Sequence, residues 1–296
     1  MAAPALEFSG VTVRKAGRDL VRDASFSVPT ASVHALLGHN GAGKTTLMRA
    51  LAGLVPVRRG SIRCEGVPTV LFVASAMPRE LTVSQILEHR RRQVRVTRSV
   101  VDDAASRCGV VPFLSRRFGQ LSTGMAQRVA LASGLVADSA TIVLDEPTTG
   151  LDPQGVDGLM RLLADLRGEG RTVLICSHDL ARLEFVCDGV TCLQGGRVTA
   201  SGPVLAVGAD VPVPGHVLRT SDDALAQRVL EGSGRTTEMT ARGLHVSGGE
   251  PLDVVVEALR GSADVTESTV DSSLFERIYG RYAFEPRPSA RRRRNG

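Results

Sequence analysis

The sequence predicts an α/β fold in which a parallel sheet forms the main core and a small α+β region follows it. Three apolar runs of strand length, at 32–37, 140–144 and 171–176, carry this prediction. Runs without polar alternation are typical of strands that are buried on both faces of a parallel sheet. Helical patterns separate them along the chain, as in α/β proteins. The 296 residues allow one large domain or two modest ones.

The first strands of the chain have a different pattern. Residues 6–13 and 24–29 alternate apolar and polar side chains, which predicts half-buried antiparallel strands. The buried strand at 32–37 then leads through a glycine-rich segment into a helical stretch at 46–52. We therefore expect an antiparallel β subdomain beside the parallel sheet.

The middle of the chain is expected to form a helical subdomain. Over about 83–136 the apolar spacing is helical and arginine is abundant. After the strand at 140–144, Pro153 begins a further helix that runs toward Gly168 and Gly170. Proline favours the first turn of a helix and glycine favours its end.

The composition changes near 202–215, where 211–215 (VPVPG) has the composition of an extended linker. Beyond the linker, short strand and helix patterns alternate. The expected strands lie at 217–219, 244–246 and 265–269, and the expected helices at 222–230, 253–259 and 272–279. We therefore expect a large domain at 1–208, a small α+β accessory domain at 215–285 and a disordered basic tail at 286–296.

Composition excludes several classes of function. The five cysteines form no CxxC pair and their number is odd, so reduced, mostly buried thiols are favoured over metal ligands or disulfides. The net charge is +5, but residues 291–294 are four consecutive arginines and the rest of the chain is nearly balanced. Aromatic residues make up only 3% and tryptophan is absent, which removes the stacking platforms of a single-strand nucleic-acid binder. We expect no nucleic-acid partner.

The chain also has no segment that predicts membrane insertion or secretion. No apolar run approaches the roughly 20 residues that span a bilayer, and the first seven residues lack a basic region followed by an apolar stretch. We therefore expect a cytoplasmic location.

The most specific motif is the segment 38–46 (GHNGAGKTT), which matches the phosphate-binding pattern G-x-x-x-x-G-K-[ST]. Its glycines allow the backbone N–H groups to form a nest around phosphates, and the following helix adds its positive end. Lys44 can reach the β- and γ-phosphates, and the Thr45 hydroxyl can ligate Mg²⁺. We expect the whole segment to bind nucleotide, through Gly38, His39, Asn40, Gly41, Ala42, Gly43, Lys44, Thr45 and Thr46.

Two carboxylates follow the buried strand at 140–144. Asp145 and Glu146 stand at its carboxyl end, where ligands of α/β sheets bind. Asp145 is suited to the Mg²⁺ shell, and Glu146 is suited to accept a proton from the attacking water. With the phosphate-binding segment, the pair predicts a P-loop site that holds a nucleotide with Mg²⁺ and can activate a water molecule.

Three further segments carry a family resemblance. The segment 121–128 (LSTGMAQR) resembles the signature motif of ABC-transporter ATPases, and 144–153 (LDEPTTGLDP) resembles that family's catalytic strand and following loop. The segment 177–179 (SHD) ends the next strand, where the family carries a switch histidine. The resemblance extends densely over residues 5–205. It implies the ABC ATPase fold and a contact between His178 and the γ-phosphate.

The resemblance also implies a shared active site. In this family two ATPase domains pair head to tail, so that Ser122 and Gly124 of one chain would close over the γ-phosphate bound by the other. Asp152 belongs to the same set of implied nucleotide-site residues. Because the chain has one such set, the resemblance implies a homodimer, or a pair of similar chains, joined by ATP. It further implies a separate membrane permease and a position at the inner face of the cell membrane.

The chain departs from the family in two places near the base and in the signature. The family usually has an aromatic residue that stacks on adenine, but 13–17 (VRKAG) contains none. Arg14 or Lys15 is an alternative cover for the ring, and weaker contact with the base is the simpler expectation. In the signature, Thr123 and Met125 replace the commoner glycine and glutamine.

A third departure concerns the link to the membrane partner. The family has a glutamine between the phosphate loop and the helical section that touches Mg²⁺ and senses that partner. The corresponding stretch, 71–83, is shortened and has no glutamine, and Gln85 comes too late. Ser75 and Glu80 are the alternatives that the stretch offers. Hydrolysis is expected to persist, because the phosphate loop, Asp145, Glu146 and His178 are all present, and the departures bear on its rate and coupling.

The leading hypothesis is the ATPase subunit of an exporter. The segment 273–279 (SLFERIY) resembles, more loosely, the extra domain of exporters of drugs, antibiotics, polysaccharides or lipids. Two alternatives stay open: a non-transport ABC ATPase acting on ribosomes or DNA, and a weakly hydrolysing, nucleotide-switched regulator. The arginines at 291–294 either touch anionic lipid headgroups or form a solvated tail.

Overall fold

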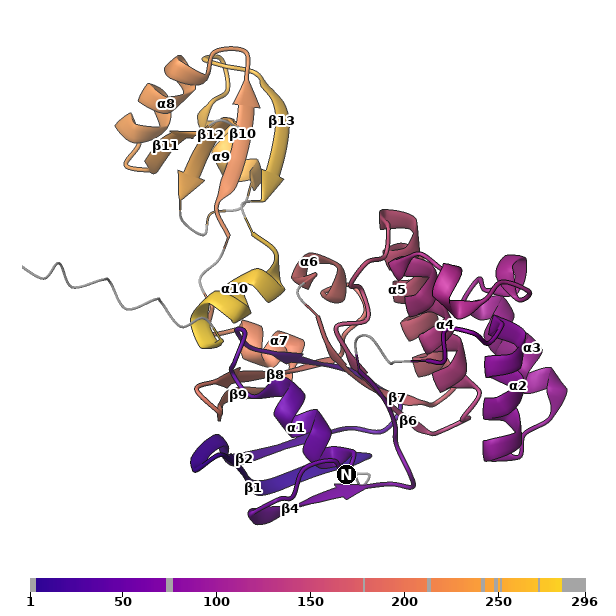
Figure 1. Cartoon of the computed structure of the whole chain (residues 1–296). Coiled ribbons are helices and arrows are strands. Elements are labelled where there is room, and N and C mark those ends of the chain that lie inside the picture. The colour runs from indigo at the N-terminus through magenta and orange to yellow at the C-terminus, as the bar shows by residue number, and fades with distance from the viewer. Residues whose placement is uncertain are drawn as a thin grey trace, which may run out of the picture. The chain divides into compact units, whose positions relative to one another are not determined.

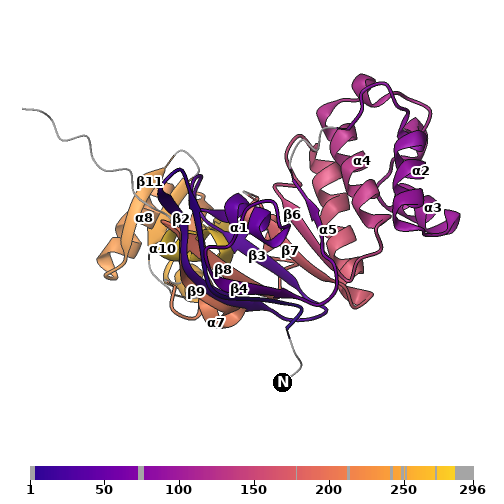
Figure 2. The same ribbon diagram turned by 60° about the horizontal axis from the view of Figure 1, so that its bottom comes forward.

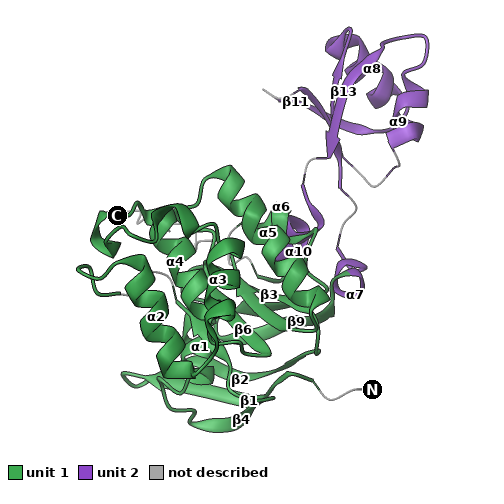
Figure 3. Ribbon diagram, turned by 90° about the vertical axis from the view of Figure 1, so that its right-hand side faces the viewer, with its two compact units in different colours: residues 1–204, 282–296 green, residues 205–281 purple. Residues whose placement is uncertain are grey.

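The structure is a computed structural model that describes residues 4–72, 77–177, 179–211, 214–240, 243–247, 250, 252–270 and 272–283. The chain divides into two compact units (Figure 3). The larger unit contains Met1–Val204 together with Tyr282–Gly296, and the smaller contains Leu205–Arg281. The expected basic tail at 286–296 lies outside the described residues.

A six-stranded sheet forms the centre of the larger unit, with strand order β5-β6-β7-β3-β8-β9. Figure 1 labels its strands β6, β7, β8 and β9. Its strands are β3 (Val33–Leu37), β5 (Thr69–Leu71), β6 (Thr141–Asp145), β7 (Thr172–Cys176), β8 (Gly189–Gln194) and β9 (Arg197–Pro203). All neighbours pair in parallel except β8 and β9. Every residue of β3, β6 and β7 is buried, so the predicted parallel core is confirmed.

A separate three-stranded antiparallel sheet has the order β2-β1-β4 (Figure 1). Its strands are β1 (Leu6–Lys15), β2 (Arg18–Val28) and β4 (Arg59–Cys64). Phe8 and Phe26 stack on its inner face with ring centroids 4.3 Å apart. They belong to a buried cluster that also contains Leu47 and Met48. The predicted antiparallel subdomain is therefore confirmed.

The helices of the larger unit follow the predicted pattern. They are α1 (Lys44–Leu51), α2 (Val83–Val94), α3 (Arg98–Arg107), α4 (Thr123–Leu135), α5 (Pro153–Gly168) and the short α6 (Leu180–Leu183). The helices α2, α3 and α4 contact one another and form the helical subdomain at one side of the sheet (Figure 2). Two short 3-10 turns, Val111–Phe113 and Phe118–Gln120, connect α3 to α4.

The smaller unit contains a βαββαβ arrangement whose four-stranded antiparallel sheet has the order β11-β12-β10-β13, a ferredoxin-like topology. Its elements are β10 (His216–Thr220), α8 (Asp223–Gly232), β11 (Thr236–Thr240), β12 (Gly243–Ser247), α9 (Leu252–Ala258) and β13 (Val265–Val270). The helices α7 (Val204–Gly208) and α10 (Leu274–Tyr282) flank this arrangement in the chain. The sequence interpretation missed β11, because its residues TTEMT show no apolar alternation and lie at a sheet edge.

Two composition-based expectations can be compared with the structure. Four of the five cysteines are buried, Cys64 is half-buried and all five are free thiols, as predicted. Within the part of the chain that the structure describes, no helix has the length and apolar character needed to cross a membrane.

Candidate functional site

The phosphate-binding segment forms the loop between β3 and α1. Gly43 immediately precedes α1 with φ of 110°, and Gly41 has φ of 89°, conformations that favour glycine. Close packing adds a second requirement. A Cβ atom on Gly38 would lie 2.6 Å from the carbonyl oxygen of Leu193, and one on Gly43 would lie 2.9 Å from that of Leu20. The glycines at 38 and 43 are therefore needed where this loop packs between β2 and β8.

The loop opens onto a cavity of about 410 Å³ at the carboxyl end of the parallel strands. The lining residues are Leu20, His39, Asn40, Gly41, Gly43, Lys44, Thr45, Thr46, Asp145 and Glu146. Seven of the nine predicted loop residues are in this set. The other two, Gly38 and Ala42, do not line the cavity, and Ala42 is fully buried.

Lys44 lies at the first position of α1 and is only 8% exposed. Its Nζ donates hydrogen bonds to the carbonyl oxygens of Gly38 at 2.6 Å and His39 at 3.4 Å. The ammonium is thus fixed inside the loop, with the backbone N–H groups of the helix start beside it. A phosphate in the cavity would meet a buried positive charge and a helix N-terminus together.

The two residues predicted to bind Mg²⁺ lie in contact. Thr45 Oγ1 donates a 2.8 Å hydrogen bond to Asp145 Oδ2, and Asp145 is 7% exposed. A hydroxyl and a carboxylate supply only hard oxygen ligands, and Mg²⁺ typically takes one or two protein ligands plus phosphate oxygens and water. Both side chains line the phosphate cavity. The donor set therefore fits Mg²⁺ carried in with a nucleotide.

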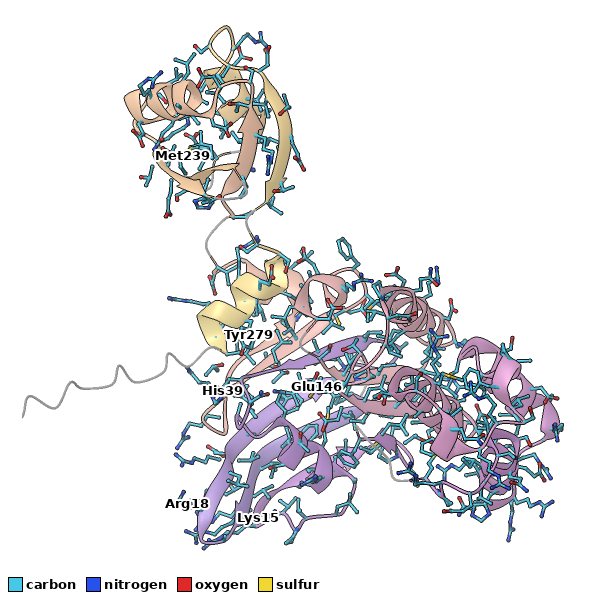
Figure 4. The ribbon with its side chains drawn as sticks, turned by 45° about the horizontal axis from the view of Figure 1, so that its top comes forward. Lys15, Arg18, His39, Glu146, Met239 and Tyr279 are labelled. Atoms are coloured by element: carbon cyan, nitrogen blue, oxygen red, sulfur yellow. The ribbon has the colours of Figure 1, made fainter. Side chains whose placement is uncertain are left out.

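Glu146 follows β6 in an unusual backbone conformation, with φ of 51°. Its N–H donates to the carbonyl oxygen of Cys176 at 2.9 Å, and its own carbonyl accepts from Thr149 N at 3.2 Å. A left-handed conformation in a residue other than glycine costs of order 1 kcal/mol or more and persists only where surrounding bonds impose it. Here those bonds turn the chain sharply after the strand, and Glu146 lines the phosphate cavity (Figure 4).

The switch position is only partly described. Ser177 Oγ lies 3.0 Å from Thr148 Oγ1 and so joins the end of β7 to the loop after Glu146. His178 itself lies outside the described residues, and its predicted contact stays a prediction.

The signature residues lie at the start of α4. Ser122 caps this helix, with Oγ accepting from Met125 N at 3.3 Å, and its side chain is exposed. At Gly124 a Cβ atom would lie 2.6 Å from the carbonyl oxygen of Gly150, so glycine permits close packing of α4 on the loop before α5. Neither residue lines the phosphate cavity, so the structure does not bring them to that site.

Asp152 has bonding partners of its own. It caps α5 by accepting from Gly155 N at 2.9 Å, and its Oδ1 also accepts from Arg128 Nη2 at 3.3 Å. It does not line the phosphate cavity either. Within a single chain, Asp152 therefore fixes α5 to α4.

Comparison with known proteins identifies the family to which these features belong. The family model described as ABC transporter matches residues 21–149. The Nod factor export ATP-binding protein I of Burkholderia orbicola is 30% identical over 300 residues, which cover 95% of this chain and 99% of that protein. The chain belongs to the family of ABC transporter ATP-binding proteins.

Two further members show the breadth of this ABC family. The hemin import ATP-binding protein HmuV of Rhodococcus jostii is 36% identical over 220 residues, which cover 68% of this chain and 75% of that protein. Among solved structures, cbiO1 from Clostridium perfringens, part of the cbiONQ complex, has a TM-score of 0.63 and 27% identity, with 71% of this chain and 92% of that chain covered. Relatives of this ABC protein therefore include both importers and exporters.

The structure identifies a residue near the base site that sequence reasoning missed. Leu20, 36% exposed, lines the phosphate cavity. Arg14, one alternative cover for the base, is paired with Asp19 at 3.1 Å and bonded to the Gly17 carbonyl. Lys15, the other alternative, is exposed at the end of β1 (Figure 4). In the sequence, Leu20 is marked only as an apolar residue that follows the polar Arg18 and Asp19 and precedes Val21.

The stretch 71–83, which lacks the family's glutamine, is only partly described. Residues 73–76, including Ser75, lie outside the described residues. Gln85 completes the cap of α2, because its Oε1 accepts from Thr82 N at 2.8 Å while Thr82 Oγ1 accepts from Gln85 N at 3.3 Å. Gln85 therefore has a structural role in this ABC protein, and Glu80 is an exposed residue in the turn before α2.

Proposed function

We propose that this chain is the ATP-hydrolysing subunit of an exporter whose membrane permease is a separate chain. The observation that carries the ATPase part is the placement of Lys44, Thr45, Asp145 and Glu146 on one cavity. Export is favoured because the Nod factor export relative matches almost the full chain, whereas the hemin import relative matches 68% of it. The proposal places the subunit on the cytoplasmic face of the membrane.

Each residue has a proposed role in hydrolysis. Lys44 and the loop N–H groups hold the phosphates, and Mg²⁺ would be held by Thr45 and Asp145 and would neutralise charge on the phosphate oxygens. Glu146, which lines the cavity, accepts a proton from the attacking water. Its φ of 51° belongs to the sharp turn of the chain after β6. His178 contacts the γ-phosphate.

The site is completed by a second copy of the chain. Ser122 and Gly124 lie away from the phosphate cavity of their own chain, and the exposed N-terminus of α4 is a ready anion site. In a head-to-tail homodimer this helix start would add positive potential where charge develops on the γ-phosphate. Asp152 would join the interface through α5.

The cargo class rests on the resemblance of the accessory region. We propose secretion of, or self-protection against, a hydrophobic or peptide product such as an antibiotic. A weakly hydrolysing regulator is the second candidate, favoured by the base site, where Leu20 lines the cavity and no aromatic residue is found in 13–17.

The decisive experiment uses the Glu146→Gln variant of the full chain. Removal of the proton acceptor should lower kcat by about 100-fold or more while ATP binding persists. The trapped nucleotide should then shift the protein from monomer to dimer in size-exclusion chromatography. The Glu65→Gln variant serves as the control and should behave as wild type, because Glu65 is exposed and does not line the phosphate cavity.

The direction of transport can be measured only when the permease is present. The subunit should co-purify with its permease, and ATP should drive uptake of a hydrophobic cargo into inside-out vesicles that contain both. ATP-driven loss of cargo from such vesicles would indicate import. Absence of an ATP-dependent Glu146→Gln dimer, even with the permease present, would contradict the composite site, and a wild-type rate far below that of transporters would favour the regulator.

A further inference from the structure

A second cavity, of about 270 Å³, lies on the antiparallel sheet of the larger unit. Its lining residues are Thr12, Arg14, Asp19, Arg22, Asp23, Arg58, Arg59 and Arg197. It shares no lining residue with the phosphate cavity. Thr12 and Arg14 alternate along β1 with the buried Val11 and Val13, so this cavity is on the outer face of the sheet, opposite its apolar core.

Backbone pairing brings these arginines together from four strands. Thr12 pairs with Arg59 in the β1–β4 register, and Arg58 N donates to the Thr12 carbonyl at 2.8 Å. On the other side, Arg22 N donates to the carbonyl of Gly196 at 2.7 Å, next to Arg197. The sheet register therefore fixes the backbones from which the guanidinium groups extend.

The charge around this cavity is unbalanced. Five guanidinium groups face two carboxylates, an excess of three positive charges. Arg14 pairs with Asp19 at 3.1 Å, and Arg22 Nε donates to the Asp19 carbonyl at 3.2 Å. Among the described residues no carboxylate forms an ion pair with Arg58, Arg59 or Arg197, and all three are exposed. Like charges held this close repel one another, and a bound anion would relieve that repulsion.

We infer that this cavity binds a small phosphate-bearing anion. A guanidinium group presents a planar fork of N–H donors that matches two oxygens of one phosphate. The volume of about 270 Å³ equals roughly nine water molecules at 30 Å³ each, which suits a phosphate or diphosphate group with some of its water. The free anion and a lipid headgroup share this chemistry.

The arginine cavity is next to the phosphate cavity along β2 but has different lining residues. Leu20 of β2 lines the phosphate cavity, whereas Arg22, two residues further along the same strand, lines the arginine cavity. An anion held at Arg22, Arg58, Arg59 and Arg197 would therefore contact residues that do not line the phosphate cavity. The inference does not depend on the proposed function, because ATP hydrolysis can be assayed separately.

The test compares pyrophosphate binding by two variants of the full chain in a Lys44→Ala background, which weakens binding at the phosphate loop. Isothermal titration calorimetry at low salt should show saturable binding that the Arg58→Gln/Arg59→Gln double substitution weakens by about tenfold or more. Arg18→Gln is the matched control, because Arg18 is an exposed arginine of the same sheet that does not line the cavity (Figure 4). It should change affinity by less than about twofold. Binding should weaken as salt is added.

A second arm identifies the source of the anion. Sedimentation with vesicles of phosphatidic acid in phosphatidylcholine is compared for the same two variants, which both keep the arginines at 291–294. A loss confined to Arg58→Gln/Arg59→Gln in the vesicle arm assigns the cavity to a lipid headgroup, and a loss confined to calorimetry assigns it to a free anion. If both variants match their parent in both arms while their melting temperatures are unchanged, the inference is wrong.

Discussion

At the scale of single residues, the proposed metal site depends on one contact between distant parts of the chain. Thr45 Oγ1 donates at 2.8 Å to Asp145 Oδ2, a residue 100 positions later. Asp145→Asn would keep an oxygen acceptor for this bond but remove the charge that holds Mg²⁺. We expect Mg²⁺-dependent ATPase activity to fall by about 100-fold, since metal charge stabilisation is worth several kcal/mol. A steady-state assay across Mg²⁺ concentrations measures this, with the exposed Asp102→Asn as control; a wild-type rate at every concentration would refute the role.

A buried histidine away from the site predicts pH-dependent stability. His34 is 1% exposed in β3, with Nε2 2.8 Å from Thr191 Oγ1. Burial lowers its pKa from 6.5 to about 4, partly offset by the charge of Asp188. Between those values the unfolded chain binds the proton and the folded chain does not, so stability present above pH 6.5 is lost as the pH falls toward 4.

The loss amounts to about 3 kcal/mol for a pKa difference of this size. Urea unfolding at several pH values should show it, and His34→Gln should flatten the dependence in that window. The exposed His89→Gln is the control and should leave it in place. A His34→Gln profile parallel to that of wild type would show that another group is responsible.

At the scale of elements, alanine substitution at two helical glycines separates the effect of close packing on stability from the effect of helix propensity. A Cβ atom added to Gly124 in α4 would lie 2.6 Å from the Gly150 carbonyl oxygen, whereas one added to Gly158 in α5 would meet open space. Gly124→Ala should therefore cost about 1–3 kcal/mol through overpacking, and Gly158→Ala should add about 0.5–1 kcal/mol through helix propensity. Thermal melts should move in opposite directions; equal shifts would show that the α4 contact is loose.

Elements were predictable where local pattern and tertiary environment agree. β3, β6 and β7 are apolar throughout because both faces are covered, and α5 begins at Pro153 with an Asp152 cap. β11 was missed because its pairing with β12 is long-range information that TTEMT does not carry. In the candidate site, the loop residues and Asp145 follow from motif spacing, but the contribution of Leu20 follows from the packing of β2 against the loop. The bond between Asp152 and Arg128 could not be predicted from motif spacing either, because the two residues meet only in the folded chain.

At the scale of the whole molecule, the two units have separate hydrophobic cores, which predicts two unfolding transitions. The smaller unit buries its own cluster, including Leu218, Leu230 and Leu244, all fully buried. The residues that line the phosphate cavity all belong to the larger unit. In differential scanning calorimetry, Mg²⁺ and ATP at about 100 times Kd should stabilise the larger unit by about 2.7 kcal/mol and leave the other transition in place.

The Leu244→Ala variant tests whether the smaller unit unfolds independently of the larger one. Truncation of a fully buried leucine costs about 2–5 kcal/mol, so the transition of the smaller unit should fall by many degrees or disappear. The transition of the larger unit should keep its position and its response to ATP, because none of the described residues in its buried cluster comes from β12. A single transition that shifts as a whole in both experiments would show that the two cores unfold as one cooperative unit.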